Sequence, residues 1–138
     1  QATLQETLSG LTVNLQVQPK KNRLELMGQG EFDFALTRWG ADYNDPSDFL
    51  NLFVTGASYN YGGYSSEAYD AYIEAANGGD MRDTDARFAD FIAAEGVILE
   101  EAAIMPLYEV SKAYLVKPNV HVDFTVNSGY MFQYASMD

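Results

Sequence analysis

One short segment of the chain carries residues whose types and spacing could do chemistry. Trp39 and Asp42 stand three positions apart, and Asp45-Pro46 follows after two further residues. An aromatic side chain beside a carboxylate can hold a cationic group, because the ring face attracts the charge and the carboxylate pairs with it. The segment follows an expected strand and precedes an expected helix, and ligands of α/β proteins meet the fold at such strand ends. The pattern therefore indicates a possible binding site for a positively charged group.

The residue types also allow a purely structural role for this segment. Tryptophan is usually buried, and aspartate often begins a turn by hydrogen bonding to its own backbone. In that interpretation Trp39 belongs to the core and Asp42 is a turn residue. Composition alone favours the structural interpretation over ligand binding.

The sequence offers neither a catalytic constellation nor a metal centre. It has no cysteine and one histidine, His121, which lacks a serine or cysteine nucleophile to activate. The segment from Asp42 to Asp48 matches a calcium loop only in part, because a proline and a serine replace a ligand and the required glycine. Glu100 and Glu101 are neighbours and point in different directions on a helix. We therefore predict no enzyme activity, no metal and no cofactor.

Charge and composition exclude further classes of protein. The 138 residues include 8 basic and 20 acidic side chains, which gives a formal net charge of −12. Binding to nucleic acid or to an anionic membrane needs a basic surface, so both are disfavoured. The hydrophobic content of 47 % is that of a globular domain. No apolar run approaches the roughly 20 residues that a transmembrane helix needs.

Capping residues and apolar spacing predict the helices around the Trp39–Asp42 segment. Asp45 caps a short helix, and Asp48 lies where an acidic side chain supports such a cap. Ser66 caps a longer helix, and residue 83 or 84 begins the longest one. The expected helices cover residues 2–10, 20–27, 47–53, 66–76 and 84–103. The residues expected to face the core are Tyr69, Ile73, Ala76, Phe88, Phe91, Ile92, Ile98, Leu99 and Ala102.

Alternating apolar and polar residues predict the strands. They cover residues 11–18, 32–37, 105–110 and 114–116, and the tail over 124–134 is weakly strand-like. The order strand, helix, strand, helices, strand, strand predicts an α/β fold with a mixed β-sheet flanked by helices. Because the chain opens inside a helix, we expect residues 1–138 to be a single partial domain of something longer.

Several spaced motifs stand in one order along most of the chain. They lie at residues 30–33, 39–46, 49–51, 64–70, 104–108 and 115–118. In this order they resemble bacterial extracellular solute-binding proteins of the oligopeptide and dipeptide ABC transporter class (family 5). The resemblance implies a fragment of the C-terminal lobe of a periplasmic-binding-protein-like type II fold. Residues from about 119 to 138 are then expected to cross back toward the other lobe.

The resemblance also implies a ligand-binding site. In that family the segment equivalent to Trp39–Asp42 lines the peptide cleft, and its aspartate receives the free α-amino group of the ligand. Carried over, Asp42 is the receptor for the ammonium group, and Trp39 and Gly40 form adjacent contacts. This reverses the balance against the structural interpretation. The further candidates, in a tyrosine-rich loop and a late strand, are Tyr59, Asn60 and Tyr108.

The function implied by the resemblance is peptide import. The protein would capture extracellular oligopeptides outside the cytoplasm, in the periplasm or as a membrane-anchored lipoprotein, and deliver them to an ABC permease in the membrane. Two alternatives stay open: a surface adhesin or interaction module without transport, and a relative that binds a nickel complex, haem or a sugar. We expect the fragment alone to bind peptides weakly, because it lacks the opposite wall of the cleft.

Overall fold

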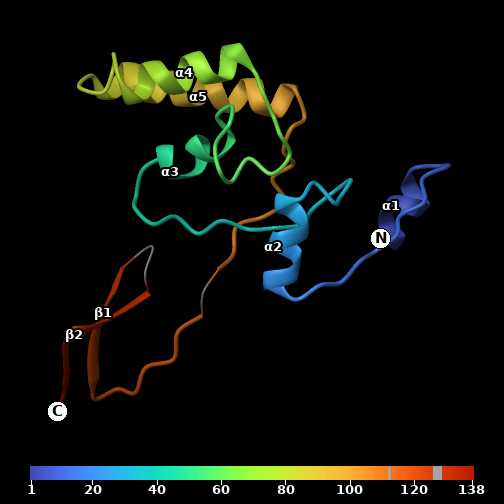
Figure 1. The fold of residues 1–138 in the computed structure, drawn as a ribbon. Helices are drawn as coiled ribbons and strands as arrows, with labels where there is room; N and C mark the ends of the chain where they lie inside the picture. The colour runs from blue at the N-terminus through green and yellow to red at the C-terminus, as the bar shows by residue number, and fades with distance from the viewer. Residues whose placement is uncertain (112, 126–128) are drawn as a thin grey trace. The chain divides into compact units, whose positions relative to one another are not determined.

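The computed structural model describes residues 1–111, 113–125 and 129–138. They divide into two compact units, residues 1–35 and residues 36–138, whose elements are labelled in Figure 1. Within the described residues, no helix combines the length and the apolar character needed to cross a membrane.

The first unit contains two short helices. α1 covers Ala2–Thr7 and α2 covers Lys20–Gly28, close to where the sequence predicts helices. The residues after α1 fold back onto it, because Gln1 Nε2 donates to the Val13 carbonyl at 2.6 Å and the Val13 N–H donates to Gln5 Oε1 at 3.0 Å. Most side chains of this unit are exposed.

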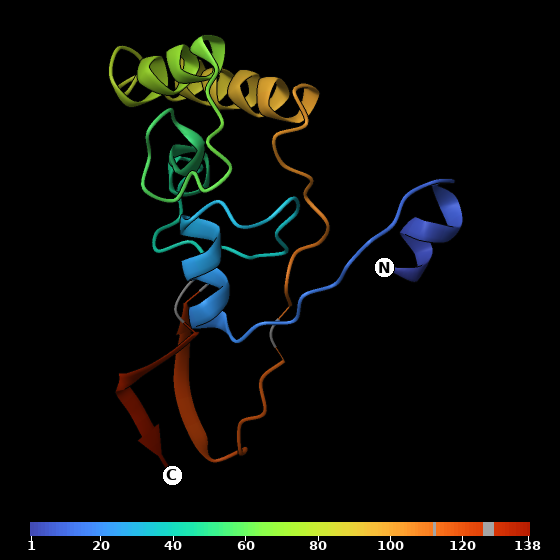
Figure 2. The same cartoon turned by 45° about the vertical axis from the view of Figure 1, so that its right-hand side comes forward.

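The second unit is built around an antiparallel pair of helices. α4 covers Glu67–Asn77 and α5 covers Thr84–Glu100, and the two lie side by side in Figures 1 and 2. The predicted caps are confirmed: Ser66 Oγ accepts from the Tyr69 N–H, and one Asp83 oxygen accepts from two N–H groups of the first turn of α5. These local hydrogen bonds start both helices where the sequence predicts.

The core lies between these two helices. It consists of Tyr69, Ile73, Ala76, Phe91, Ala94 and Ile98. The prediction that Phe88, Ile92, Leu99 and Ala102 also face the core is wrong, because these residues are exposed. The apolar stripe of α5 is wider than the one face that α4 covers, so its outer edge stays uncovered by the described residues.

A short helical turn packs against this pair. α3 covers Ser47–Leu50 and continues into the 3₁₀ turn η1 at Asn51–Phe53, as the sequence predicts. The buried Tyr69 hydroxyl donates to the Leu50 carbonyl at 2.6 Å and thereby fastens α3 to α4. The chain segment that leads into α3 is held close to the helical pair by this contact.

The C-terminal residues form a hairpin. β1 covers Val120–Thr125 and β2 covers Gly129–Met137, and the two strands pair antiparallel with a register shift between His121 and Asp123. The ends of the weakly strand-like tail over 124–134 lie in these strands, while residues 126–128 lie outside the described residues. The exposed His121 pairs with Asp138 at 2.8 Å.

The strands predicted at residues 11–18, 32–37, 105–110 and 114–116 do not form ladders in the described part of the chain. A strand needs a hydrogen-bonded neighbour, and these segments find none among the described residues. Their apolar side chains are correspondingly open, with Phe34 91 % and Leu115 97 % exposed. The prediction of strands at these four positions is therefore wrong for the described residues, because alternation alone does not supply a partner strand.

Candidate functional site

The carboxylate of Asp42 is exposed at the surface of the second unit. The backbone N–H of Asp42 is engaged, but no hydrogen bond or ion pair joins its side chain to another described residue. Within the described residues, Asp42 is thus not a turn aspartate whose side chain bonds to its own backbone. The side chain is available to a ligand.

Asp48, and not Asp42, is the aspartate whose side chain has a structural role here. It is only 7 % exposed, and its Oδ2 accepts two hydrogen bonds, from Trp39 Nε1 at 2.8 Å and from the Asp42 N–H at 3.1 Å. The predicted capping role of Asp48 toward Asp45 is wrong, because the carboxylate turns to these earlier residues instead. One buried oxygen therefore connects the tryptophan and the backbone of Asp42.

Trp39 is partly buried and belongs to an aromatic surface. Its ring lies edge-on to Tyr59 with centroids 4.9 Å apart, and Tyr59 lies edge-on to Tyr61 at 6.2 Å. Tyr59 is 52 % exposed. Edge-to-face contacts of this kind are favourable and hold rings in fixed orientations. Trp39 is therefore not a core residue. Its ring forms an aromatic wall together with Tyr59 and Tyr61.

Asn60 organises the loop that carries Tyr59. Its amide nitrogen donates to the carbonyl of Tyr64 at 2.7 Å and lies within 3.3 Å of two further carbonyls, those of Phe53 and Val54. Its amide oxygen accepts from the Tyr64 N–H at 3.0 Å. The side chain is thus occupied within its own loop, and its predicted contact with a ligand stays a prediction.

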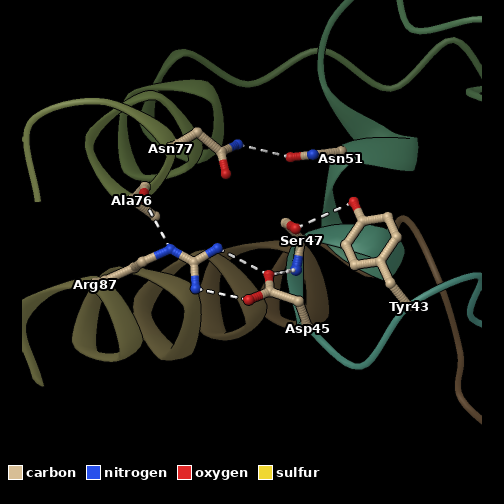
Figure 3. Close-up of polar contacts among 7 residues, drawn as sticks. All are labelled: Tyr43, Asp45, Ser47, Asn51, Ala76, Asn77 and Arg87. Carbon is tan, nitrogen blue, oxygen red and sulfur yellow. Dashed lines mark hydrogen bonds and ion pairs between the residues drawn. The ribbon is translucent and has the colours of Figure 1, made fainter. Parts of the chain in front are cut away.

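An ion pair fixes the chain between Asp42 and α3 (Figure 3). Arg87 of α5 donates to both oxygens of Asp45, at 2.7 and 2.8 Å, and its Nε donates to the Ala76 carbonyl at 3.1 Å. Asp45 also accepts from the Ser47 N–H at 2.9 Å, which is the predicted cap of α3. The hydrogen bonds from Arg87 hold the pKa of Asp45 well below its usual range. The segment is therefore anchored to both helices of the core.

The charge at the site is negative. The ion pairs of the described residues are Arg87–Asp45 and His121–Asp138, so neither Asp42 nor Asp48 is neutralised by a cation of this part of the chain. Two neighbouring carboxylates, one of which accepts from the backbone N–H of the other residue, favour a positive group over a negative one. The binding of such a group stays a prediction.

The remaining predicted site residues lie apart from these contacts. Gly40 is exposed, and a side chain there would meet nothing within 4 Å, so its backbone is accessible. Tyr108 lies in the extended chain after α5 and is 78 % exposed, not part of the core. Its contact with a ligand stays a prediction.

One hollow of the second unit does not coincide with this site. It lies over η1 and α4 and is lined by Asn51, Val54, Ala57, Asp70, Ile73, Glu74 and Asn77. None of the predicted site residues borders it. Trp39 and Asp42 therefore lie outside this hollow.

Comparison with curated proteins identifies relatives, although no protein-family model matches the chain. The dipeptide-binding protein of Lactococcus lactis subsp. cremoris is 40 % identical over 121 residues, which are 87 % of this chain and 22 % of that protein. The periplasmic oligopeptide-binding protein OppA of Salmonella typhimurium is 38 % identical over 109 residues, 79 % of this chain and 20 % of the relative. The chain thus spans about a fifth of the length of these relatives.

Solved structures show the same relationship. The substrate-binding domain of an oligopeptide ABC transporter from Bacillus anthracis has a TM-score of 0.82 at 31 % identity, over 97 % of this chain and 26 % of that structure. Listeria monocytogenes OppA bound to peptide has a TM-score of 0.80 at 34 % identity, over 99 % and 26 %.

The fold and its solved neighbours define a part of a lobe of the type II periplasmic-binding class, as the sequence predicts. Within that class the chain belongs to the dipeptide- and oligopeptide-binding proteins of ABC transporters, family 5, which confirms the resemblance. The sequence did not predict the role of Asp48 or of Arg87. The sequence does indicate a role for Asp48, because an acidic residue three positions after a cap is a recognised signal. That signal predicts a contact with the cap, whereas the structure shows a contact with Trp39.

Proposed function

We propose that the chain forms one wall of the ligand-binding cleft in the peptide-binding component of an ABC importer. Asp42 receives the α-ammonium group of a peptide, and Trp39, Gly40 and Tyr59 form the adjacent surface. The exposed Asp42 carboxylate, which forms no ion pair within the described residues and whose backbone shares an acceptor with Trp39, is the observation that supports this function most directly. The names of the relatives support it independently.

The mechanism follows from the chemistry of a peptide end. Every unmodified peptide carries an α-ammonium group, so a fixed carboxylate can set the register of the ligand without reading its side chains. On an open surface such a pair contributes roughly 0–1 kcal/mol, whereas charged hydrogen bonds in a closed cleft contribute roughly 1.5–3 kcal/mol. Capture would therefore become tight only when a second lobe closes over the peptide. The loaded protein would then deliver the peptide to a membrane permease.

The proposed function also implies where in the cell the protein works. Curated relatives are named periplasmic, and a receptor that feeds an importer works outside the cytoplasmic membrane. Attachment to the membrane as a lipoprotein is part of the proposal. Tyr108 and Asn60 are kept as candidate contacts for later parts of the peptide.

The test compares two ligands that differ by one charge. Binding of tri-alanine and of N-acetyl-tri-alanine is measured by calorimetry on the product of the reading frame that encodes this chain. We expect Asp42→Asn to weaken tri-alanine binding by about 10- to 100-fold, because the charged hydrogen bonds are lost. Binding of the acetylated peptide should be weak and unchanged. Asp33→Asn, an exposed aspartate outside the site, is the matched control.

Equal loss of both ligands in Asp42→Asn, or no loss of either, would contradict the role of Asp42. A non-peptide solute is the competing result. A relative from Escherichia coli, 32 % identical, is named a probable deoxycholate-binding protein, and this bile acid has no ammonium group. Binding of deoxycholate in place of tri-alanine would replace the peptide proposal.

A further inference from the structure

Asp48 is the only one of three neighbouring aspartates that is buried and that faces the site. Its exposed fraction is 7 %, and Asp45, three residues earlier, is occupied by Arg87. Buried carboxylates are costly unless hydrogen bonds satisfy them, so an apolar or amide side chain would be the simpler choice for packing alone. The charge at this position therefore calls for a role beyond packing.

The hydrogen bonds of Asp48 identify that role. Both donors, Trp39 Nε1 and the Asp42 N–H, bind the same oxygen, Oδ2, at 2.8 and 3.1 Å. The first hydrogen bond favours one orientation of the Trp39 ring, and the second holds the backbone of Asp42, the residue that is exposed to solvent. One atom therefore holds both the tryptophan and the backbone from which the exposed carboxylate projects.

We propose that Asp48 is a positioning residue for the recognition of the peptide amino terminus. It contacts no ligand; it holds Trp39 and Asp42 in the arrangement in which a positive group can meet the ring and the carboxylate together. Positioning of this kind raises affinity because the site loses no conformational freedom when the ligand binds. The inference rests on the proposed function of Asp42.

The indole N–H gives a direct readout of the arrangement. Trp39 is the single tryptophan of the 138 residues, and its N–H donates to a carboxylate. In the NMR spectrum of the product of the reading frame, Trp39→Phe identifies this resonance. We expect Asp48→Ala to move the Trp39 indole resonance and the Asp42 amide resonance together, because both lose the same acceptor. Asp48→Asn, which keeps one oxygen as an acceptor, should move them less.

Peptide binding then separates positioning from stability. The readout is the ratio of the affinities for tri-alanine and N-acetyl-tri-alanine, which reports only how well the ammonium group is received. We expect Asp48→Ala to lower this ratio by about tenfold, and Asp48→Asn to restore part of it. Asp83→Ala removes a carboxylate that caps α5 outside the site, so it should lower stability and leave the ratio unchanged.

The outcomes are distinct. Wild-type protein that binds tri-alanine no better than its acetylated form overturns the proposed function and this inference with it. A wild-type ratio retained in Asp48→Ala overturns the inference alone, and so does a ratio that falls equally in Asp83→Ala. Indole and amide resonances that stay in place in Asp48→Ala would also overturn it.

Discussion

Asp42, Asp45 and Asp48 are aspartates spaced three residues apart, but their side chains differ in exposure and in hydrogen-bond partners. Asp42 is exposed and unpaired among the described residues, Asp45 is clamped by a guanidinium, and Asp48 is buried against two N–H donors. Of the three side chains, that of Asp42 is the one left open to solvent, which is why the proposed function assigns the ligand to it. Asp48 holds the Asp42 backbone, and Asp45 fastens the following residues to α5.

The clamp on Asp45 predicts a loss of stability on substitution. Asp45→Asn removes one charge from a partly exposed two-fold hydrogen-bonded pair, so the free energy of unfolding should fall by about 1–2 kcal/mol. Chemical denaturation followed by circular dichroism measures the change. Asp85→Asn, on the first turn of α5, is the control with little expected effect. A stability of Asp45→Asn equal to wild type would show that the pair contributes nothing.

The same pair predicts a dependence on pH. Because the pKa of Asp45 is lowered in the folded state, its contribution is complete above the unfolded value near 3.9 and is lost as the pH falls toward the folded pKa. The stability difference between wild type and Asp45→Asn should therefore be constant from about pH 5 to 8 and shrink below about pH 4. Denaturation series at several pH values measure it. A difference that grows on acidification would contradict the assignment.

At the scale of elements, the loop from Val54 to Tyr64 depends on one amide side chain. Asn60→Ala removes the hydrogen bonds to the Tyr64 backbone and leaves the partly buried Tyr64 carbonyl without this donor. We expect a loss of about 1–3 kcal/mol and faster hydrogen exchange at the Tyr64 amide. Asn44→Ala, at an exposed asparagine, is the control. Unchanged exchange at Tyr64 would show that the backbone holds the loop without Asn60.

Local rules predict the helices better than the strands. Asp45, Ser66 and Asp83 accept hydrogen bonds from N–H groups two or three residues later, so each cap is visible in a few consecutive residues. A strand depends on a hydrogen-bonded partner strand, and the alternation of residues 11–18 or 32–37 does not indicate which segment that partner is. The contacts of the candidate site likewise depend on residues that are distant in sequence. Asp48 bonds to residues six and nine positions earlier, and Arg87 to one 42 positions earlier, beyond the reach of a spacing rule.

At the scale of the whole chain, a charge of −12 accompanies large exposed apolar side chains such as Phe34 and Leu115. Repulsion between chains opposes association through these side chains. We therefore expect the chain to associate as the pH falls toward its isoelectric point of about 4.2, with light scattering as the measurement. Phe34→Ser should shift the onset to lower pH, and Thr37→Ser should leave it unchanged. Scattering that stays constant down to pH 4.2 would contradict this.

Arg87 links the segment around Asp45 to both long helices of the second unit. It contacts Asp45, the last turn of α4 through the Ala76 carbonyl, and the face of Phe91 at 4.7 Å. We therefore expect a shift of either long helix to move the chain beside Asp42. Laboratory selections for altered cargo should return substitutions along this helical pair, remote from the cargo itself.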